Sequence, residues 1–479
     1  MPYDLVTIGG GFSGLVSAAR AAELGLKVAV LEARTEDRYP CSSRYTTGVS
    51  NVMGLAILAD PDVLYRAIIN GSGGTANPAL ARAVADNGKR AIDWLAAQGA
   101  RFITRALQKD QPGQKVLAPP RRLIAGLDWE GRGGDVVMRQ LEQNLIKRGG
   151  VVQRGTRVTE LVIQNGVCVG VIASQNGTQN GARVRIDSRA VVIADGGFAA
   201  NPQMVAQYIT PRADRVLARV GPGANGDGIR LAETAGAAIG GFGAFYGHVH
   251  HSAAMQNSKL WPYPHLDAVA EVALLIGPDG RRFTDEGLGG VCQANAIARL
   301  ADPLSAHLIM DDAMWQLEPK LTTTVAANSA MVTAGGALVS ATDLETLAAR
   351  IDVSASALAE TVREHNEAVA ANDFGRLTIP RSAKKHKPMA FLVPPYHAVP
   401  LCAGITGTMG GVVIDAQARA QKRQGGVFEG LYAVGTPVAG LEGGPRAGYV
   451  GGLSKAFILG LLAAEQAATS AAQHERTIA

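Results

Sequence analysis

The chain has 479 residues, of which 47% are hydrophobic and 18% are charged, a composition that indicates a globular protein with a large core. The length exceeds that of a typical single compact domain and favours two domains. A formal charge of +5 and an isoelectric point near 9.0 arise without a dense run of Lys and Arg, so nothing indicates a nucleic-acid partner.

The four cysteines, Cys41, Cys168, Cys292 and Cys402, form no C-x-x-C pair, and their spacing fits neither a zinc site nor a disulfide framework. This favours a reducing compartment. The N-terminus leads directly into the first predicted strand, and the most apolar late segment, residues 456–468, is too short to span a bilayer. We therefore expect a cytoplasmic protein with no membrane span.

Residues 3–34 read as a strand, a glycine-rich turn, a helix and a second strand. The apolar run 5–8 predicts the first strand, and the run 27–31 predicts the second, which ends at Glu32. Three glycines between the strands have the G-x-G-x-x-G spacing: Gly9, Gly11 and Gly14. This order matches the dinucleotide-binding fingerprint in its proper structural context.

Each part of the fingerprint has a physical role. Gly9 allows a tight turn, Gly11 lets the backbone approach a pyrophosphate, and Gly14 lets the helix pack close to the strand. The helix N-terminus offers free N–H groups to the phosphates, and Glu32 can accept hydrogen bonds from ribose hydroxyls. The alternative is a glycine-rich turn that binds nothing.

The remaining pattern alternates between helical and strand segments. Helices are predicted at residues 60–99, 133–148 and 342–372, and a last helix ends near residue 468. Strands are predicted at residues 151–153, 159–164, 167–173, 190–194 and 430–434. Asn-Gly pairs predict hairpin turns at Asn165–Gly166, Asn176–Gly177 and Asn180–Gly181.

Near residue 240 the composition changes, and the stretch to residue 388 carries most of the histidines and several aromatic residues. The pattern of the first part returns near residue 390. We expect residues 1–239 to form the first part of a nucleotide-binding domain, residues 240–388 an inserted domain, and residues 389–479 the return to the first domain. The fold class is α/β, with a Rossmann-like first domain and an α+β insertion.

Several ordered blocks then carry a family resemblance. They are DLVTIGGGFSGLVSAARAAELGLKVAVLEA, CSSRYTTG, TRVTELV, AVVIADGGFAANPQM, GANGDGIRLAETAGA, DGRRFTDEG, PPYHAVPLCAGITGTMGGVVID and GLYAVGTPVAGLEGGPRAGYVGGLSKA. With these blocks the chain resembles the flavoproteins of the fumarate reductase and succinate dehydrogenase superfamily over nearly its whole length. It is more similar to the tricarballylate dehydrogenase and 3-ketosteroid dehydrogenase types than to true fumarate reductases.

The resemblance implies FAD and an FAD-binding domain interrupted by a mobile capping domain. It implies hydride exchange between flavin N5 and a C–C bond next to the carbonyl or carboxyl group of a small-molecule substrate. The segment CSSRYTTG contains no histidine for covalent attachment, so we expect non-covalent FAD. The electron donor or acceptor cannot be assigned from the sequence.

The resemblance also implies cofactor contacts, residue by residue. The pyrophosphate positions are Gly9, Gly11, Phe12, Ser13 and Gly14, and the adenosine positions are Glu32, Ala33 and Val158. Positions near the ribitol and the ring are Ser42, Ser43, Thr47 and Gly48. Further positions follow by motif: Asp195, Gly196, Asn225, Asp227, Gly228, Gly435, Gly451, Gly452, Leu453 and Ser454. Asp227 can alternatively cap a helix.

The chain departs from fumarate reductases at three positions. Gly290 stands where these enzymes carry a proton-donating arginine, and Gly407 stands where they carry a carboxylate-binding histidine. Tyr449 stands where they carry a carboxylate-clamping arginine. Fumarate is therefore not the expected substrate.

Four residues are the catalytic candidates: Tyr449, Arg446, Tyr246 and His250. Tyr449 can donate a hydrogen bond to a carbonyl or act as an acid or base, and its alternative is a packing role. Arg446 can pair with substrate or with Glu442. A histidine of the capping region binds substrate in several relatives. We expect no metal, because no Cys or acid lies near the His-x-His-His spacing in the sequence.

Two rival hypotheses remain at this stage. The first is a flavin oxidase or hydroxylase that uses oxygen. The second is a non-catalytic protein that binds partners on the same fold without flavin. The intact Glu32, Asp195 and Asn225–Asp227 blocks argue against the second.

Overall fold

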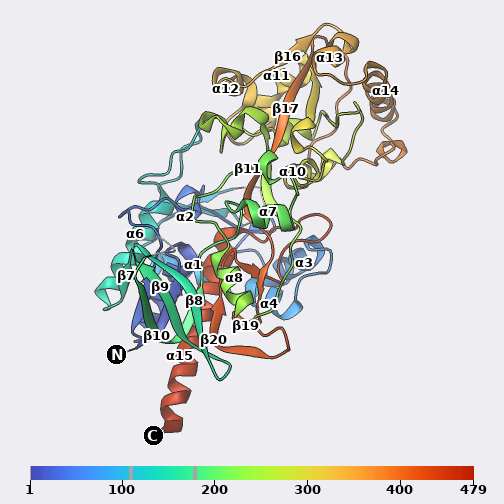
Figure 1. Ribbon diagram of the computed structural model, residues 1–479. Coiled ribbons are helices and arrows are strands. Elements are labelled where there is room, and N and C mark those ends of the chain that lie inside the picture. Colours follow the sequence, from blue (N-terminus) through green and yellow to red (C-terminus); the bar gives the residue numbers. More distant parts are fainter. Residues whose placement is uncertain (1, 107–111, 176–180, 384, 479) are drawn as a thin grey trace.

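A twisted sheet forms the centre of the lower lobe of the molecule (Figure 1). The computed structural model describes residues 2–106, 112–175, 181–383 and 385–478. The strand order is β19-β20-β9-β10-β1-β2-β7, and β8 pairs with β9. The bounds are β1 Tyr3–Ile8, β2 Val28–Leu31, β7 Val151–Gln153, β8 Thr156–Gln164, β9 Val167–Gln175, β10 Arg183–Ile193, β19 Arg419–Gln421 and β20 Val427–Ala433. β1 pairs in parallel with both β2 and β10, as expected for a strand buried on both faces.

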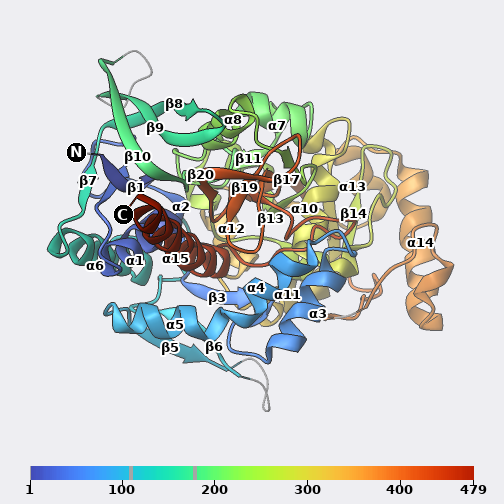
Figure 2. The same cartoon turned by 90° about the horizontal axis from the view of Figure 1, so that it is seen from below.

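Two helices from opposite ends of the chain pack against each other beside this sheet. They are α1 (Phe12–Glu23) and α15 (Gly452–Ile478), and they lie next to each other in Figure 2. Phe12 and Phe457 meet edge to face with centroids 5.2 Å apart. At Gly460 a Cβ atom would lie 2.9 Å from a methyl carbon of Val16, so glycine permits the close approach. The C-terminal helix thus packs against the first helix of the chain.

The predicted helical region 60–99 consists of α3 (Pro61–Gly71), α4 (Pro78–Asp86) and α5 (Gly88–Ala97). Asp60 caps α3 by accepting hydrogen bonds from the backbone N–H groups of Asp62 and Val63. Beside these helices lies a small sheet of order β4-β3-β6-β5. Its bounds are β3 Val49–Val52, β4 Leu55–Ala56, β5 Phe102–Arg105 and β6 Gln114–Leu117. The predicted helix 133–148 is α6 (Gly133–Lys147).

A second sheet belongs mainly to the upper lobe and is built on the long strand β17 (Tyr396–Thr408). The other strands are β11 Leu217–Ala218, β13 Phe245–His251, β14 Leu274–Ile276, β15 His307–Asp311 and β16 Val339–Ala341. β17 runs from the upper lobe into the lower one (Figure 1). Residues 396–408, which the sequence pattern assigns to the returning first domain, therefore pair with the inserted strands. The reason is that β17 is one continuous strand that serves both lobes.

The helices of the upper lobe surround this sheet. Their bounds are α9 Asp267–Ala270, α10 Gly290–Ala298, α11 Asp312–Leu321, α12 Ala327–Thr333, α13 Leu344–Arg350 and α14 Ala355–Ala371. The helical segment expected at 342–372 consists of α13 and α14. Ser354 separates them, because its hydroxyl caps α14 by accepting from the N–H of Ala357.

The remaining helices and strands are short. They are α2 Ser42–Tyr45, α7 Pro202–Tyr208, α8 Asp227–Thr234, β12 Ile239–Gly240, β18 Gly411–Val413 and β21 Val438–Ala439. The turn at Asn165–Gly166 joins β8 and β9, with both residues at positive φ, as predicted. The turn predicted at Asn176–Gly177, together with Asn180, lies outside the described residues. Within the described ranges, no helix is both long and apolar enough to cross a membrane.

Candidate functional site

Two connected cavities lie between the glycine-rich turn and the upper lobe. The first has a volume of about 440 Å³ and the second about 400 Å³. They share these lining residues: Ser13, Ser42, Ser43, Val220, Thr406, Gly407, Thr408 and Thr436. The cavities therefore form one elongated site that runs from the lower sheet toward the inserted lobe.

The glycine-rich turn forms one wall of the first cavity. Gly9 has φ +98°, a conformation that favours glycine, and a Cβ atom at Gly14 would overlap the carbonyl oxygen of Gly9. α1 begins at this turn with the N–H of Phe12 donating to the Ser43 hydroxyl at 3.0 Å. The turn and the start of α1 thus have the arrangement expected of a phosphate-binding turn.

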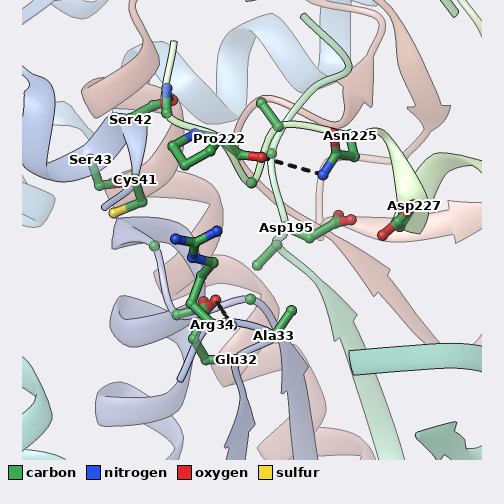
Figure 3. Close-up of a pocket in the computed structure, with 18 of the residues that line it drawn as sticks. Glu32, Ala33, Arg34, Cys41, Ser42, Ser43, Asp195, Pro222, Asn225 and Asp227 are labelled. Carbon is green, nitrogen blue, oxygen red and sulfur yellow. Dashed lines mark hydrogen bonds between the residues drawn. The ribbon is translucent and has the colours of Figure 1, made fainter. Parts of the chain in front are cut away.

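Glu32 lies at the end of β2 and lines the same cavity. Its Oε2 accepts from the N–H of Gly10 at 2.9 Å, and its Oε1 accepts from the N–H of Arg34 at 2.8 Å. Burial raises the pKa of Glu32 although these two N–H groups favour the charged form. Figure 3 shows Glu32, Ala33 and Arg34 on one side of the cavity and Asp195 on another.

Asp195 lies directly after β10, on the floor of the first cavity. Its Oδ2 accepts from the N–H of Gly228 at 2.7 Å, whereas its buried Oδ1 has no partner among the described residues. Burial raises the pKa of Asp195 to about 7, and the nearby Asp227 adds to this effect. A Cβ atom at Gly228 would overlap the Asp195 side chain. The site therefore offers a buried oxygen that is ready to bind a ligand donor.

Asn225 and Asp227 lie on the wall of the first cavity that is opposite Glu32 (Figure 3). The Asn225 side chain donates to the carbonyl of Pro222 at 3.4 Å. Asp227 forms ion pairs with Arg157 and Arg230. The alternative that Asp227 caps a helix is not observed, because the N-cap of α8 is Gly226 in a left-handed conformation and Asp227 is the first residue of the helix.

The structure brings most of the expected cofactor residues to these cavities. The first cavity is lined by Gly9, Gly11, Ser13, Glu32, Ala33, Ser42, Ser43, Val158, Asp195, Gly196, Asn225 and Asp227. The second is lined by Phe12, Ser13, Ser42, Ser43, Thr47, Gly452 and Leu453. Expected positions that line neither cavity are Gly14, Gly48, Gly228, Gly435, Gly451 and Ser454.

These non-lining positions support the walls instead. A Cβ atom at Gly435 would overlap the Ser13 hydroxyl, and one at Gly451 would overlap the carbonyl of Asn51. The Ser454 hydroxyl donates to that same carbonyl of Asn51 at 2.6 Å. Gly451 and Ser454 thus hold the start of α15 close to β3, so that Gly452 and Leu453 face the second cavity.

Tyr449 and Tyr246 meet in the second cavity. Their rings are stacked with centroids 3.9 Å apart and planes inclined by 10°. The N–H of Gly452 donates to Tyr449 Oη at 2.6 Å. Burial raises the pKa of Tyr449 well above its usual value and that of Tyr246 to about 12. Both phenols are therefore protonated, and hence able to donate, at neutral pH.

The other two catalytic candidates lie elsewhere. The imidazole of His250 is fully buried and does not line the cavity, because Gly404 and Arg219 cover it. His248, two residues earlier on β13, lines the cavity in its place. Arg446 is exposed and also lies outside the lining, and Glu442 pairs with Lys455 rather than with Arg446. Arg446 therefore neither lines the cavity, where it could pair with a substrate, nor pairs with Glu442.

Sequence reasoning missed several residues of the second cavity. Arg219 donates to the Thr406 hydroxyl at 2.7 Å and to the carbonyl of Pro262 at 3.0 Å. Burial lowers the pKa of Arg219. Lys455 lines the cavity beside Glu442, and their ion pair is buried. No local motif marks either cation. The only available signal was the position of Lys455 within the block GGLSKA.

The fold and the site define a two-lobed protein with a Rossmann-like sheet and a dinucleotide-binding fingerprint at an elongated cavity. Comparisons with known proteins specify the cofactor. A family model described as an FAD binding domain matches residues 4–448. The chain belongs to this FAD-binding family.

The relatives are oxidoreductases. The chain is 26% identical to a fumarate reductase (cytochrome) from Shewanella frigidimarina, over 97% of this chain and 77% of the relative. It is 23% identical to a urocanate reductase from Eggerthella lenta, over 98% and 75%. A 3-ketosteroid-Δ4-(5α)-dehydrogenase from Rhodococcus jostii RHA1, solved with 4-androstene-3,17-dione, superposes with a TM-score of 0.71 at 20% identity over 98% and 97%. The chain is an FAD-dependent oxidoreductase.

The residues present fit FAD. The unpartnered Oδ1 of Asp195, the helix N-terminus at Gly11 and the carboxylate of Glu32 all lie in the first cavity. The second cavity continues past Ser13 to the start of α15, which leaves room for the flavin end of the cofactor. A helix N-terminus at Gly452 suits negative charge on that end.

Proposed function

We propose that the protein exchanges a hydride between FAD and a C–C bond next to the carbonyl or carboxyl group of a small molecule. The observation that carries the proposal is the second cavity, where Tyr246 and Tyr449 form a stacked pair of protonated phenols beside the start of α15. FAD, when bound, supplies the atom that gives or accepts the hydride. The chain supplies binding, orientation and the proton.

Tyr449 is proposed to polarise the substrate carbonyl. Its raised pKa keeps the O–H in place at neutral pH, and a protonated phenol stabilises negative charge that develops on a carbonyl oxygen. The short contact with the N–H of Gly452 uses an acceptor lone pair of Oη and leaves the O–H available to donate. Tyr449 thus acts as a donor and fixes the orientation of the carbonyl.

The substrate is proposed to carry one carbonyl or carboxyl group rather than two carboxylates. The resemblance places Gly290, Gly407 and Tyr449 where fumarate reductases have cationic or imidazole side chains. The guanidinium of Arg121 is held by backbone carbonyls, and that of Arg219 donates to Thr406 and Pro262. Nε of Arg219 is buried without a partner among the described residues, and it can donate to one further acceptor.

We also propose that FAD is bound without a covalent link. The segment 41–48 beside the second cavity holds no histidine, and burial raises the pKa of the Cys41 thiol to about 11. Trichloroacetic acid should therefore release the yellow colour into the supernatant. Colour that stays in the pellet after washing contradicts this proposal. A cytoplasmic location is proposed from the cysteine spacing alone, and a fusion to a compartment-specific reporter tests it.

The test of the function is anaerobic. The purified holoenzyme is photoreduced and mixed in turn with cyclohex-2-en-1-one, crotonate and fumarate, while the absorbance of oxidised flavin is followed. We expect recovery with the enone or the monocarboxylate, and slow or no recovery with fumarate. Fast recovery with fumarate contradicts the proposed substrate class. Recovery only on admission of air indicates an oxygen-using oxidase, and a purified protein that neither contains nor binds FAD indicates a non-catalytic role.

A further inference from the structure

A hydrogen-bonded chain of three side chains reaches the second cavity from the inserted lobe. Asp267 Oδ2 lies 2.6 Å from His248 Nδ1, and His248 Nε2 lies 3.1 Å from Tyr246 Oη. His248 and Tyr246 line the cavity, while Asp267 lies behind them at the start of α9. An acid, an imidazole and a hydroxyl in this order are able to hold and move a proton.

We propose that Asp267, His248 and Tyr246 form the acid–base unit of the reaction. As the Tyr246 oxygen takes the proton from the carbon next to the carbonyl, its own O–H proton passes to Nε2 of His248, which holds it until the reverse transfer returns a proton to the carbon. Asp267 is a positioning residue that fixes the tautomer and orientation of the imidazole. This inference rests on the proposed function and goes beyond it, because it assigns the proton to a group other than Tyr449.

The hydrogen bonds of Asp267 fix its orientation. Its Oδ1 accepts from the N–H of Val249 at 2.8 Å, so Oδ2 is directed at His248. Burial alone would raise the pKa of Asp267, but the neighbouring His265 and His248 outweigh it, and the pKa lies below its usual value. Asp267 is therefore an anion, and the Nδ1 atom of His248 carries the proton that it accepts.

Gly290 makes room for this arrangement. A Cβ atom at Gly290 would overlap the carboxylate of Asp267, so no larger side chain fits while Asp267 holds this position. This is the position at which the resemblance places a proton-donating arginine in fumarate reductases. The exchange of that arginine for glycine thus accompanies a different set of proton-carrying groups.

Other charged and titratable groups face His248. The ring of His265 is stacked on it at 4.6 Å, and burial lowers the pKa of His265 to about 3, so this neighbour is neutral. His250 lies 6.5 Å away, and burial also lowers its pKa well below the usual value. The remaining nearby groups are Arg219, Tyr263, Tyr449 and Lys385. Asp267 is thus the one anion in direct contact with the His248 ring among the described residues.

His248, His265 and Asp267 also have a geometry that could hold a metal ion. The 2.6 Å distance between His248 Nδ1 and Asp267 Oδ2 argues against this. Two ligands of one tetrahedral zinc ion, each bound at about 2.0 Å, lie about 3.3 Å apart. The observed distance is that of a hydrogen bond between the two side chains.

Proton transfer can be measured without hydride transfer. The holoenzyme is reduced with dithionite, so that the flavin accepts no hydride, and is incubated with cyclohexanone in D₂O. In this exchange the C–H bond next to the carbonyl breaks, its electron pair remains in the enolate, and a deuteron returns to the carbon. Proton NMR of cyclohexanone then reports the acid–base unit alone.

We expect H248Q to lower the enzyme-catalysed exchange rate on the order of 100-fold, and D267N to lower it by about tenfold with a changed pH profile. Imidazole added to H248A should restore part of the rate. H307Q, a histidine of β15 that lines neither cavity, is the matched control and should exchange as the wild type does. Bound flavin, measured by its absorbance, should be equal in all variants.

Several outcomes overturn the inference. One is an H248Q variant that exchanges cyclohexanone protons as fast as the wild type does. Another is a wild-type enzyme whose reduced flavin is reoxidised by cyclohex-2-en-1-one but which exchanges no cyclohexanone protons. Stoichiometric zinc that EDTA removes together with the exchange activity assigns the three residues to a metal instead. A wild type that neither exchanges these protons nor is reoxidised by cyclohex-2-en-1-one or crotonate fails the proposed function itself, and the inference fails with it.

Discussion

The rings of Tyr246 and Tyr449 lie parallel, with centroids 3.9 Å apart. Tyr246 belongs to β13 of the inserted sheet, whereas Tyr449 precedes α15 of the first domain. The pair therefore joins the two lobes at the second cavity. Any change in the angle between the lobes therefore changes the position of one phenol relative to the other.

Replacement of Tyr449 by Phe keeps the stacked ring and removes the O–H. We expect kcat with cyclohex-2-en-1-one or crotonate, whichever reoxidises the wild-type flavin, to fall by roughly 100-fold, because one donor to a developing oxyanion is lost, while FAD binding changes little. Stopped-flow reoxidation of the reduced flavin measures this. The control is Tyr208→Phe, since Tyr208 is stacked on Phe242 with the same 3.9 Å centroid distance but lines neither cavity. Equal rates in Y449F and the wild type rule out the role of Tyr449.

Replacement of Gly290 by Ala tests the space beside Asp267. The added methyl group would overlap the carboxylate, so we expect Asp267 to move, kcat to fall at least tenfold, and FAD affinity to remain unchanged. Gly277→Ala is the control, because a Cβ atom there meets its nearest neighbour at an ordinary 3.4 Å. Flavin titration and turnover measured on both variants separate the effects. Normal turnover in G290A would show that the position of Asp267 does not matter.

Asp195 should make the stability of the FAD-free protein depend on pH. Burial raises its pKa to about 7 in the folded protein, so the folded state binds its proton more tightly than the unfolded state does. The stabilisation that Asp195 gives to the folded state is fully present below pH 4 and is lost as the pH rises from 4 through 7. We expect the unfolding free energy of the wild type, measured relative to that of D195N, to fall by about 2–4 kcal/mol over this pH range. The lower value allows for screening of the carboxylate by solvent in the cavity.

Urea unfolding of the wild-type and D195N apoproteins at pH 4.5 and 7.5 measures this difference. The comparison within each pH removes the effect of other groups with raised pKa, such as Glu271 and Glu318. A difference between the two proteins that is the same at both pH values contradicts the prediction.

The ion pair of Lys455 and Glu442 should stabilise the fold only as a pair. The side chains are 1% and 4% exposed, so K455M leaves a buried carboxylate without its cation, and we expect a loss of about 3–5 kcal/mol. The double variant K455M/E442Q should recover part of this loss, because the amide still accepts from the N–H of Val450. Denaturant unfolding measures both.

A surface pair provides the control for this prediction. Lys89 and Asp93 are 78% and 60% exposed, so K89M should change the unfolding free energy by at most about 0.5 kcal/mol. A double variant less stable than K455M would mean that Glu442 stabilises the fold independently of Lys455.

The sequence by itself determined the first unit and its ligand class. Gly9, Gly14 and Glu32 lie within one strand–helix–strand segment, where local turn geometry and helix packing dictate the residue type. The pattern therefore predicted the turn, the parallel strands and the cavity wall. The ordered blocks along the chain predicted FAD and a two-lobed fold, which the family match and the structural comparison confirm.

Only the tertiary structure decided the membership of β17 and the choice between His248 and His250. A strand shared by two lobes has no local signal at the point where one lobe ends. His248 and His250 are two residues apart on one strand and share a face, so alternation cannot separate them. The covering by Gly404 and Arg219 buries His250, whereas His248 remains at the cavity. Asp267 and Gly290 reach that histidine only through folding, because contacts between distant segments depend on packing and leave no periodic pattern in the sequence.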